Sequence, residues 1–356
     1  MKSYFGVCDE GEIYMKSEKI LPFTSKPLSI MYHYTAFPLA ILQANMPEEI
    51  LDKFISTKYV NCIFETKSLK NKFNIGNDLW FTEERILLRH SNVFSDIILK
   101  YYDIDIVKFL KDMMDKGLYP QGNYNEEWIP GKFAYQKYHF YHDYLLIGYN
   151  DEKQVFYSVG FLKDDRFQKF EIPYINMKKA VETLFDTYIG IDLLEYNARR
   201  VANVPITFHN MLSELIDYLN SINKTSNKIV NSETYYGLAA ILELCNYIKR
   251  EACQHQNIEI KYMRGFMEHK FFMNKRINYL FEQGYIKNSL SINYSEEVYK
   301  ISEKVHLLAI KYLMTHQNNI IDSIVESIKQ TIKIEKEYLP IIIDELKNGK
   351  LKEERI

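Results

Sequence analysis

The stretch "YHDYLLIGYNDEKQVFYSVGF" (141–161) decides the fold class, because it has the pattern of two apolar strands joined by a polar turn. Large apolar side chains occupy four successive positions, 144–147, so both faces of the first strand are apolar. A strand of this kind is typical of the interior of a sheet. His142 opens the strand, which raises the question of whether its imidazole is a catalytic base.

The turn between the two strands sets a predicted register. "NDEK" (150–153) is polar and is predicted as a four-residue loop. This loop pairs residue 149 with residue 154 and places residue 161 opposite residue 142.

Two further interpretations of His142 stay open beside catalysis. A histidine at a strand end is often bonded to a backbone carbonyl and has a structural role only. A metal site shared with His139 is disfavoured, because positions three apart on a strand point to opposite faces. No close set of metal ligands occurs elsewhere, so we expect neither a metal nor another cofactor.

On either side of this hairpin, the pattern of apolar and polar residues divides the chain into two predicted domains. Residues 1–187 mix strand and helix patterns, including an alternating segment over 58–67. Residues 188–356 consist mainly of amphipathic segments of helix length, and Pro340 is expected to break the last of them. We therefore predict an α+β domain with a mixed or antiparallel sheet, followed by an all-helical domain.

Composition excludes several classes of partner. The 356 residues carry a net charge of −2 without a basic block, so no nucleic-acid partner is expected. No apolar run is long enough to span a membrane, and residues 1–20 lack the apolar core of a signal peptide. The cysteines, Cys8, Cys62, Cys245 and Cys253, form no CxxC pair. We expect a cytoplasmic protein with reduced thiols.

Several motifs resemble known proteins. "MMDKGLYP" (113–120) followed by "HDYLLIGYNDEKQVFYSVGF" (142–161) resembles the second half of the papain-like fold. The similarity is to bacteriocin-processing cysteine peptidases and to the N-terminal domain of the butirosin biosynthesis protein H family. The whole chain looks like uncharacterised proteins associated with nonribosomal peptide biosynthesis clusters. These proteins share "YTAFPLAIL" (34–42), "NEEWIP" (125–130), "YQKYHFYHDYLLIGYN" (135–150) and "EHKFFMNKRINYL" (268–280).

The resemblance implies a cysteine acyltransferase fold that moves an aminoacyl group from a carrier-protein thioester to an amine. In that family a helix-start cysteine attacks, a strand histidine activates it, and an aspartate or asparagine one strand later orients the histidine. Only the histidine has a match here, at His142. The helix start holds His33, Tyr34 and Thr35, and the position across the hairpin holds Val159, Gly160 and Phe161. The nearest acids there, Asp164 and Asp165, lie beyond the strand end.

The candidate residues follow from these matches. The candidate catalytic residues are His142, Tyr34, Thr35 and Asp143, with Tyr34 or Thr35 as an oxygen nucleophile or hydrogen-bond donor. The candidate substrate-binding residues are His33, Glu126, Glu127, Trp128 and Tyr149. The alternative for the loop that carries Glu126 and Glu127 is a solvated acidic turn anchored by Trp128.

Four other residues carry weaker signals. Cys62 lies on an apolar strand face, where a free cysteine is usually an inert core residue. Cys8 lies in a short N-terminal segment far from the histidine strand in sequence. Glu268 or His269 is expected to anchor the helical half to the N-terminal half through hydrogen bonds rather than to act in catalysis.

Two functions therefore compete. The first is an accessory protein of peptide metabolite biosynthesis, which has lost the standard cysteine and binds a carrier-linked or peptide intermediate. The second is an acyltransferase or thioester-processing enzyme, with His142 as general base and either a non-cysteine nucleophile or direct attack by an amine. A conventional cysteine peptidase is disfavoured by the empty nucleophile position. A carrier protein or peptide synthetase is the expected partner, and the oligomeric state stays open.

Overall fold

A computed structural model gives the architecture of the chain. It describes residues 17–66, 71–76, 87–95, 104–184, 190–206, 208–224, 234–254, 256–349 and 354–355. The chain divides into two compact units. We call residues 1–22 and 91–195 the sheet unit, and residues 23–90 and 196–356 the helical unit. The predicted division at residues 187 and 188 stays a prediction, and each unit is described by itself.

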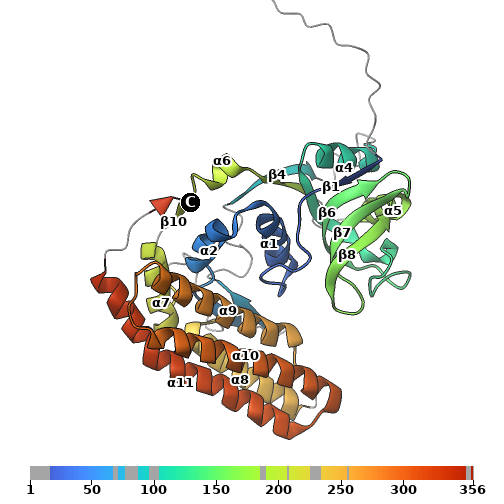
Figure 1. Cartoon of the computed structure of the whole chain (residues 1–356). Coiled ribbons are helices and arrows are strands. Elements are labelled where there is room, and N and C mark those ends of the chain that lie inside the picture. The colour runs from blue at the N-terminus through green and yellow to red at the C-terminus, as the bar shows by residue number, and fades with distance from the viewer. Residues whose placement is uncertain are drawn as a thin grey trace, which may run out of the picture. The chain divides into compact units, whose positions relative to one another are not determined.

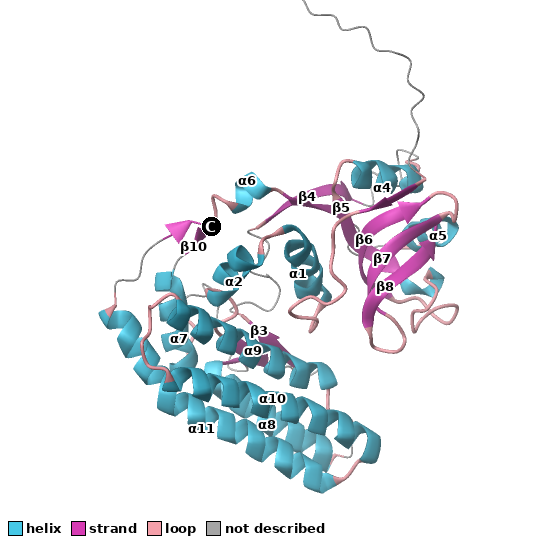
Figure 2. Ribbon diagram, in the orientation of Figure 1, coloured by secondary structure: helices cyan, strands magenta, loops and turns pink. Residues whose placement is uncertain are grey.

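The sheet unit is built on an antiparallel sheet. Its strands are β1 (Glu18–Ile20), β4 (Leu88–Ser95), β5 (Tyr119–Asn125), β6 (Tyr141–Asn150), β7 (Val155–Phe161), β8 (Phe167–Pro173) and β9 (Gly190–Tyr196). Their order is β4-β9-β5-β6-β7-β8, with β1 paired to β6, and β5 to β8 lie side by side (Figure 2). The central position predicted for the histidine strand is confirmed, since β6 has paired neighbours along both sides.

The predicted register of the β6–β7 hairpin is wrong. Tyr149 pairs with Phe156 rather than with residue 154, so the turn begins one residue later than expected. The Asn150 side chain accepts a hydrogen bond from the backbone N–H of Lys153 at 2.9 Å and closes this turn. A bulge between Leu146 and Gly148 then shifts the register again.

Glycine is required at this bulge because another backbone passes close to it. A Cβ atom on Gly148 would lie 2.2 Å from the carbonyl oxygen of Lys19 in β1. The absence of a side chain therefore lets β1 join β6 beyond the point where β5 ends its pairing.

Two helices pack on the sheet and on each other, α4 (Ile106–Asp115) and α5 (Tyr174–Glu182) (Figure 1). The Asp105 side chain caps α4 by accepting from the backbone N–H groups of Val107 and Lys108. A short 3-10 helix, η2 (Glu126–Trp128), follows β5 and begins the long loop back to β6.

The helical unit holds most of the helices. They are α1 (His33–Asn45), α2 (Glu48–Ser56), α6 (Ala198–Val201), α7 (Phe208–Asn220), α8 (Gly237–Cys253), α9 (Ile260–Glu282), α10 (Leu290–Thr315) and α11 (Asn318–Asn348). A small sheet has the order β11-β2-β3, with β2 (Cys62–Glu65), β3 (Lys72–Ile75) and β11 (Thr234–Tyr236), and β10 (Pro205–Ile206) pairs with β12 (Glu354–Arg355). In this unit α10 packs between α9 and α11 (Figure 1).

The expectation that Pro340 breaks the last helix is wrong, because α11 runs through it. Proline removes one backbone hydrogen bond from a helix interior. Here the buried stripe of α11 continues on both sides, through Tyr338 and Leu339 before the proline and Ile342 and Ile343 after it. Burial of these side chains holds the helix together across the break in its hydrogen bonding.

Glu268 and His269 make hydrogen bonds to the N-terminal half of the sequence as predicted, but these contacts lie within the helical unit and do not join the two units. The Ser29 hydroxyl donates to Glu268 Oε2 at 2.5 Å, and the Ile30 N–H donates to Oε1 at 2.9 Å. His269 Nε2 lies 3.0 Å from the carbonyl oxygen of Val60. Burial raises the pKa of the Glu268 carboxyl to about 7. These contacts fix the segment that leads into α1.

Candidate functional site

The histidine of β6 has a carboxylate partner, which comes from the end of β5. His142 pairs with Tyr124 in the β5–β6 ladder, and Glu126 lies two residues beyond Tyr124. Positions two apart on a strand share a face, so the register directs Glu126 towards the imidazole. His142 Nδ1 lies 2.8 Å from Glu126 Oε1.

A buried lysine completes this arrangement, which we call the His142 cluster (His142, Glu126 and Lys132). Lys132 Nζ lies 3.4 Å from Glu126 Oε1 and donates to the carbonyl oxygen of Phe161 at 2.7 Å. The side chains of Lys132 and Glu126 are only 3% and 6% exposed. The lysine therefore ties the carboxylate to the end of β7.

The charge state of Glu126 follows from these contacts. Burial alone would raise the pKa of its carboxyl group, but the hydrogen bond from His142 and the charge of Lys132 lower that pKa below its ordinary value. Burial lowers the pKa of Lys132, and Glu126 opposes that effect. An ionised carboxylate only accepts hydrogen bonds, so Nδ1 of His142 is the donor. In the neutral imidazole, Nε2 is then the ring nitrogen that carries no proton.

The imidazole is open to solvent on one side. Its side chain is 38% exposed, while its carboxylate partner is buried. The Phe140 ring lies beside it, with ring centroids 5.5 Å apart. The hydroxyl of Tyr157 donates to Glu18, and the ring of Phe161 packs on Phe167. A buried carboxylate on Nδ1 of a partly exposed imidazole is what a general base requires.

The loop between β5 and β6 is built around a buried asparagine. The Asn125 side-chain oxygen accepts from the N–H groups of Glu127 and Phe140, each at 3.2 Å. Its amide nitrogen lies 2.8 Å from His139 Nδ1 and donates to Thr183 Oγ1 at 3.2 Å. The interpretation of this loop as a solvated acidic turn is wrong for Glu126, which is 5% exposed.

Glu127 and Trp128 lie on the same loop but turn away from the imidazole. Glu127 Oε2 lies 2.8 Å from Nδ1 of His139. The carbonyl oxygen of Trp128 accepts from Asn176 at 2.7 Å, and the Lys179 ammonium group lies 5.0 Å from the centre of the indole ring. These contacts attach the loop to α5.

Asp143 and Tyr149 are separated from the His142 cluster by the geometry of β6. Asp143 points to the opposite face and accepts from Asn123 at 3.0 Å. The hydroxyl of Tyr149 donates to Asp115 at 2.8 Å, seven residues along the strand from His142. At about 3.3 Å per residue this distance is roughly 23 Å, so the structure does not bring Tyr149 to the imidazole.

The three residues of the expected nucleophile position lie in the helical unit. They form the first turn of α1, as the sequence predicted. Thr35 and His33 are buried, and the His33 ring stacks on Phe37 at 4.8 Å. The Tyr34 hydroxyl lies 3.3 Å from Asn74 Oδ1. The predicted pairing of Tyr34 or Thr35 with His142 stays a prediction, because the two positions belong to different units.

The two buried cysteines of the described residues, Cys62 and Cys245, are not activated thiols. Burial raises the pKa of the Cys62 thiol to about 12, and its Sγ lies 3.4 Å from the carbonyl oxygen of Gly237. Burial raises the pKa of Cys245 to about 12 as well. Cys8 lies outside the described residues. A thiolate at neutral pH requires the opposite environment.

Sequence reasoning missed the roles of Lys132 and Asn125. It also looked for the orienting carboxylate across the β6–β7 hairpin, whereas the structure supplies it from β5. One signal was present in the sequence: a pair of glutamates follows the strand that precedes the histidine strand. Pairing of these two strands as a hairpin would have directed one glutamate towards His142.

Comparison with protein-family models and with curated proteins gives no match to this chain. Among the described residues no group of three metal-ligating side chains is close enough to hold a metal ion. Within that same part of the chain, each helix is too short or too polar to cross a bilayer. The assignment of the His142 cluster as a candidate site therefore depends on the geometry of its residues alone.

Proposed function

We propose that this protein is an acyltransferase or thioester-processing enzyme in which His142 is the general base. The observation that carries the proposal is the contact of 2.8 Å between His142 Nδ1 and the buried Glu126 carboxylate, on an imidazole that stays 38% exposed. The carboxylate fixes the tautomer and stabilises the imidazolium ion that forms during proton transfer.

The proposed reaction needs no protein nucleophile. An incoming amine attacks the carbonyl carbon of an acyl thioester, and Nε2 of His142 removes a proton from the amine nitrogen. A carbon–nitrogen bond forms and the carbon–sulfur bond breaks. The leaving thiolate takes the proton from the imidazolium ion, which restores the neutral imidazole. The raised pKa of Cys62 favours this direct route over thiol catalysis.

The elements of the fold are compatible with the proposal. An antiparallel sheet with a central histidine strand is compatible with a papain-like domain and with an aminoacyl thioester on a carrier protein as the substrate. The competing function is the accessory protein of peptide metabolite biosynthesis, which uses the same surface for binding only. The two functions are distinguished by whether His142 accelerates the thioester reaction.

The test uses a small thioester, alanyl-N-acetylcysteamine, with glycinamide as the amine, and follows thiol release and amide formation by the full chain. His142→Ala is expected to lower kcat by about 10²- to 10⁴-fold, the usual contribution of a general base. His209→Ala is the matched control, because His209 is an exposed histidine of α7 in the helical unit, and it should keep the wild-type rate.

Glu126→Gln separates orientation from proton transfer. It keeps a hydrogen-bond acceptor for Nδ1 but removes the charge, so kcat should fall while KM stays within about twofold. Equal turnover by wild type and His142→Ala would overturn the proposal and leave the accessory function.

A further inference from the structure

The helical unit carries an elongated groove along α11 that the His142 cluster does not use. Leu219 of α7, Leu238 and Leu242 of α8, and Ile332 of α11 line the first part, a hollow of about 490 Å³. A second hollow of about 250 Å³ adjoins it through Leu219.

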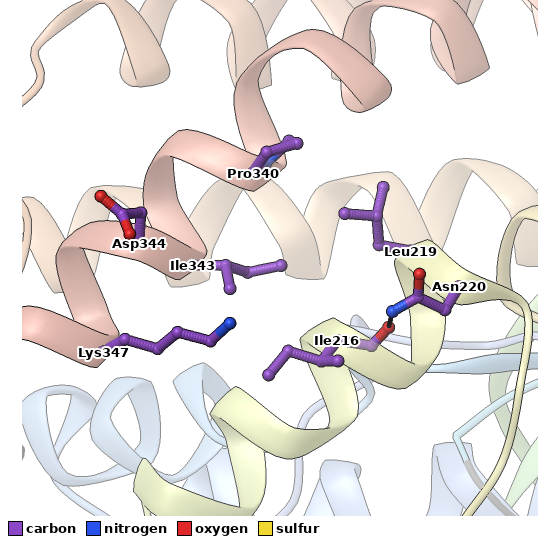
Figure 3. Close-up of a pocket in the computed structure, with 7 residues that line it drawn as sticks. All are labelled: Ile216, Leu219, Asn220, Pro340, Ile343, Asp344 and Lys347. Atoms are coloured by element: carbon purple, nitrogen blue, oxygen red, sulfur yellow. Dashed lines mark hydrogen bonds between the residues drawn. The ribbon is translucent and has the colours of Figure 1, made fainter.

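The second hollow continues along the same helix face. It is lined by Ile216, Leu219 and Asn220 of α7 and by Pro340, Ile343, Asp344 and Lys347 of α11. Figure 3 shows the lining residues of α7 facing those of α11, with the Lys347 side chain reaching into the space between the two helices. The lining positions of α11 run from 329 to 347 at steps of three and four, which is one face of the helix. This face is about 27 Å long at 1.5 Å per residue.

The floor of the groove is apolar and its rim is basic. Leu242 is 46% exposed, although it is a leucine in the middle of a helix. Lys329, Lys333 and Lys336 line the first hollow and are exposed, and no ion pair of the described residues involves them. Among the described residues that line the two hollows, Asp344 is the single acid.

We propose that this groove binds an acidic amphipathic helix of a partner protein. An apolar stripe in a groove between helices is the surface that a helix with anchors at steps of three and four fits. The lysine rim supplies the complementary charge for glutamates or aspartates beside that stripe. The length of about 27 Å corresponds to a helix of about 18 residues. A small ligand is a poorer fit, because small-molecule sites enclose most of their ligand whereas these hollows lie in line along an open surface.

The test uses two fluorescent synthetic peptides of 18 residues, with leucines at i, i+3, i+4 and i+7 and either glutamates or lysines at the flanking positions. Binding to the full chain is measured by fluorescence anisotropy. The acidic peptide should bind at least tenfold more tightly than the basic one, and its affinity should fall as salt is added.

Two double variants locate the site. K329E/K333E should weaken the acidic peptide about tenfold and tighten the basic one. K304E/K311E reverses two exposed lysines of α10, changes the net charge equally, and should alter either affinity by less than about twofold. Leu242→Ser should weaken both peptides, which distinguishes the groove from a purely electrostatic attraction.

Several results would overturn the proposal: equal weakening by the two double variants, no effect of Leu242→Ser, or no binding of the acidic peptide. Displacement of the peptide by monomeric dodecanoate would assign the groove to a small anionic amphiphile instead. A dimer of the chain that K329E/K333E dissociates would assign it to a second copy.

Discussion

Two buried lysine–glutamate pairs, one in each unit, differ in what surrounds the carboxylate. In the sheet unit the Glu126 carboxylate lies 3.4 Å from Lys132 and also holds His142, which is open to solvent. In the helical unit the Glu335 carboxylate accepts from Lys270 at 2.7 and 2.8 Å and from the hydroxyl of Tyr218 at 2.8 Å. Lys270 and Glu335 have no exposed side-chain surface, so this second cluster (Lys270, Glu335 and Tyr218) is sealed.

The difference shows how similar residues serve different purposes. A sealed, fully bonded network fixes one arrangement of the helices but cannot exchange a proton with a substrate. The His142 cluster is less enclosed, because the imidazole of His142 reaches the surface. A buried pair becomes a candidate site when its third member is accessible and able to titrate.

The largest expected effect is on the sealed cluster. Lys270→Met should lower the free energy of unfolding by about 3–5 kcal/mol, because it leaves the Glu335 charge buried and unpaired. Urea unfolding followed by circular dichroism measures the change. Lys132→Met leaves Glu126 with its bond from His142, so its stability loss should be smaller while the thioester activity falls.

A double variant keeps this comparison testable if the single change prevents folding. Lys270→Met combined with Glu335→Leu replaces the pair by apolar groups and should recover most of the loss. If Lys270→Met and Lys132→Met lower the free energy of unfolding by the same amount, the sealed cluster contributes no more to stability than the open one, and the comparison is wrong.

A second comparison concerns two buried glutamates with opposite pKa shifts. The hydrogen bond from His142 and the charge of Lys132 lower the pKa of Glu126, whereas burial raises the pKa of Glu268 from 4.5 to about 7. A group with a raised carboxyl pKa stabilises the fold below pH 4.5 and loses that contribution as the pH rises towards 7. The loss should reach about 3 kcal/mol, since one pKa unit corresponds to about 1.4 kcal/mol.

Glu268→Gln should remove this pH dependence. Relative to wild type, the variant should gain about 3 kcal/mol of stability between pH 4.5 and pH 8, as measured by urea unfolding at several pH values. Glu126→Gln should act at the acidic end, because a lowered carboxyl pKa gives stability that is present above the ordinary pKa and lost as the pH falls. Parallel curves for wild type and Glu268→Gln would contradict the raised pKa.

Much of the fold follows from the sequence. The apolar run at 144–147 correctly predicts a central strand, and the strand and helix patterns correctly indicate an α+β chain with antiparallel sheets and a helical C-terminal region. The register failed because it depends on where a turn begins and on a bulge. The position of the turn depends on the contact of Asn150 with Lys153, and the bulge depends on the close approach of β1 to Gly148. The pattern of apolar and polar residues contains no signal for either contact.

The candidate site was predicted in part. His142 and Glu126 were both candidates, but their contact depends on the pairing of β5 with β6 across a long loop. The burial of Lys132 depends on the same pairing, and an isolated lysine in a loop normally indicates a solvated position. Long-range register, rather than residue type, was the missing information.

The smallest expected effect concerns a thiol in the sealed region. Cys62 lies near Lys270 and Glu335, and burial raises its pKa to about 12, so it should neither react nor catalyse. Cys62→Ala should leave the rate of the thioester reaction within about twofold, because the proposed route uses no thiol. Iodoacetamide should label exposed Cys253 in the folded protein and reach Cys62 only after unfolding, as mass spectrometry of the digested chain would detect. Rapid labelling of Cys62 with loss of thioester turnover would instead make this residue the nucleophile. It would also show that the surroundings of Lys270 and Glu335 open to reagents of that size. Burial would then no longer distinguish the structural cluster of the helical unit from the reactive His142 cluster.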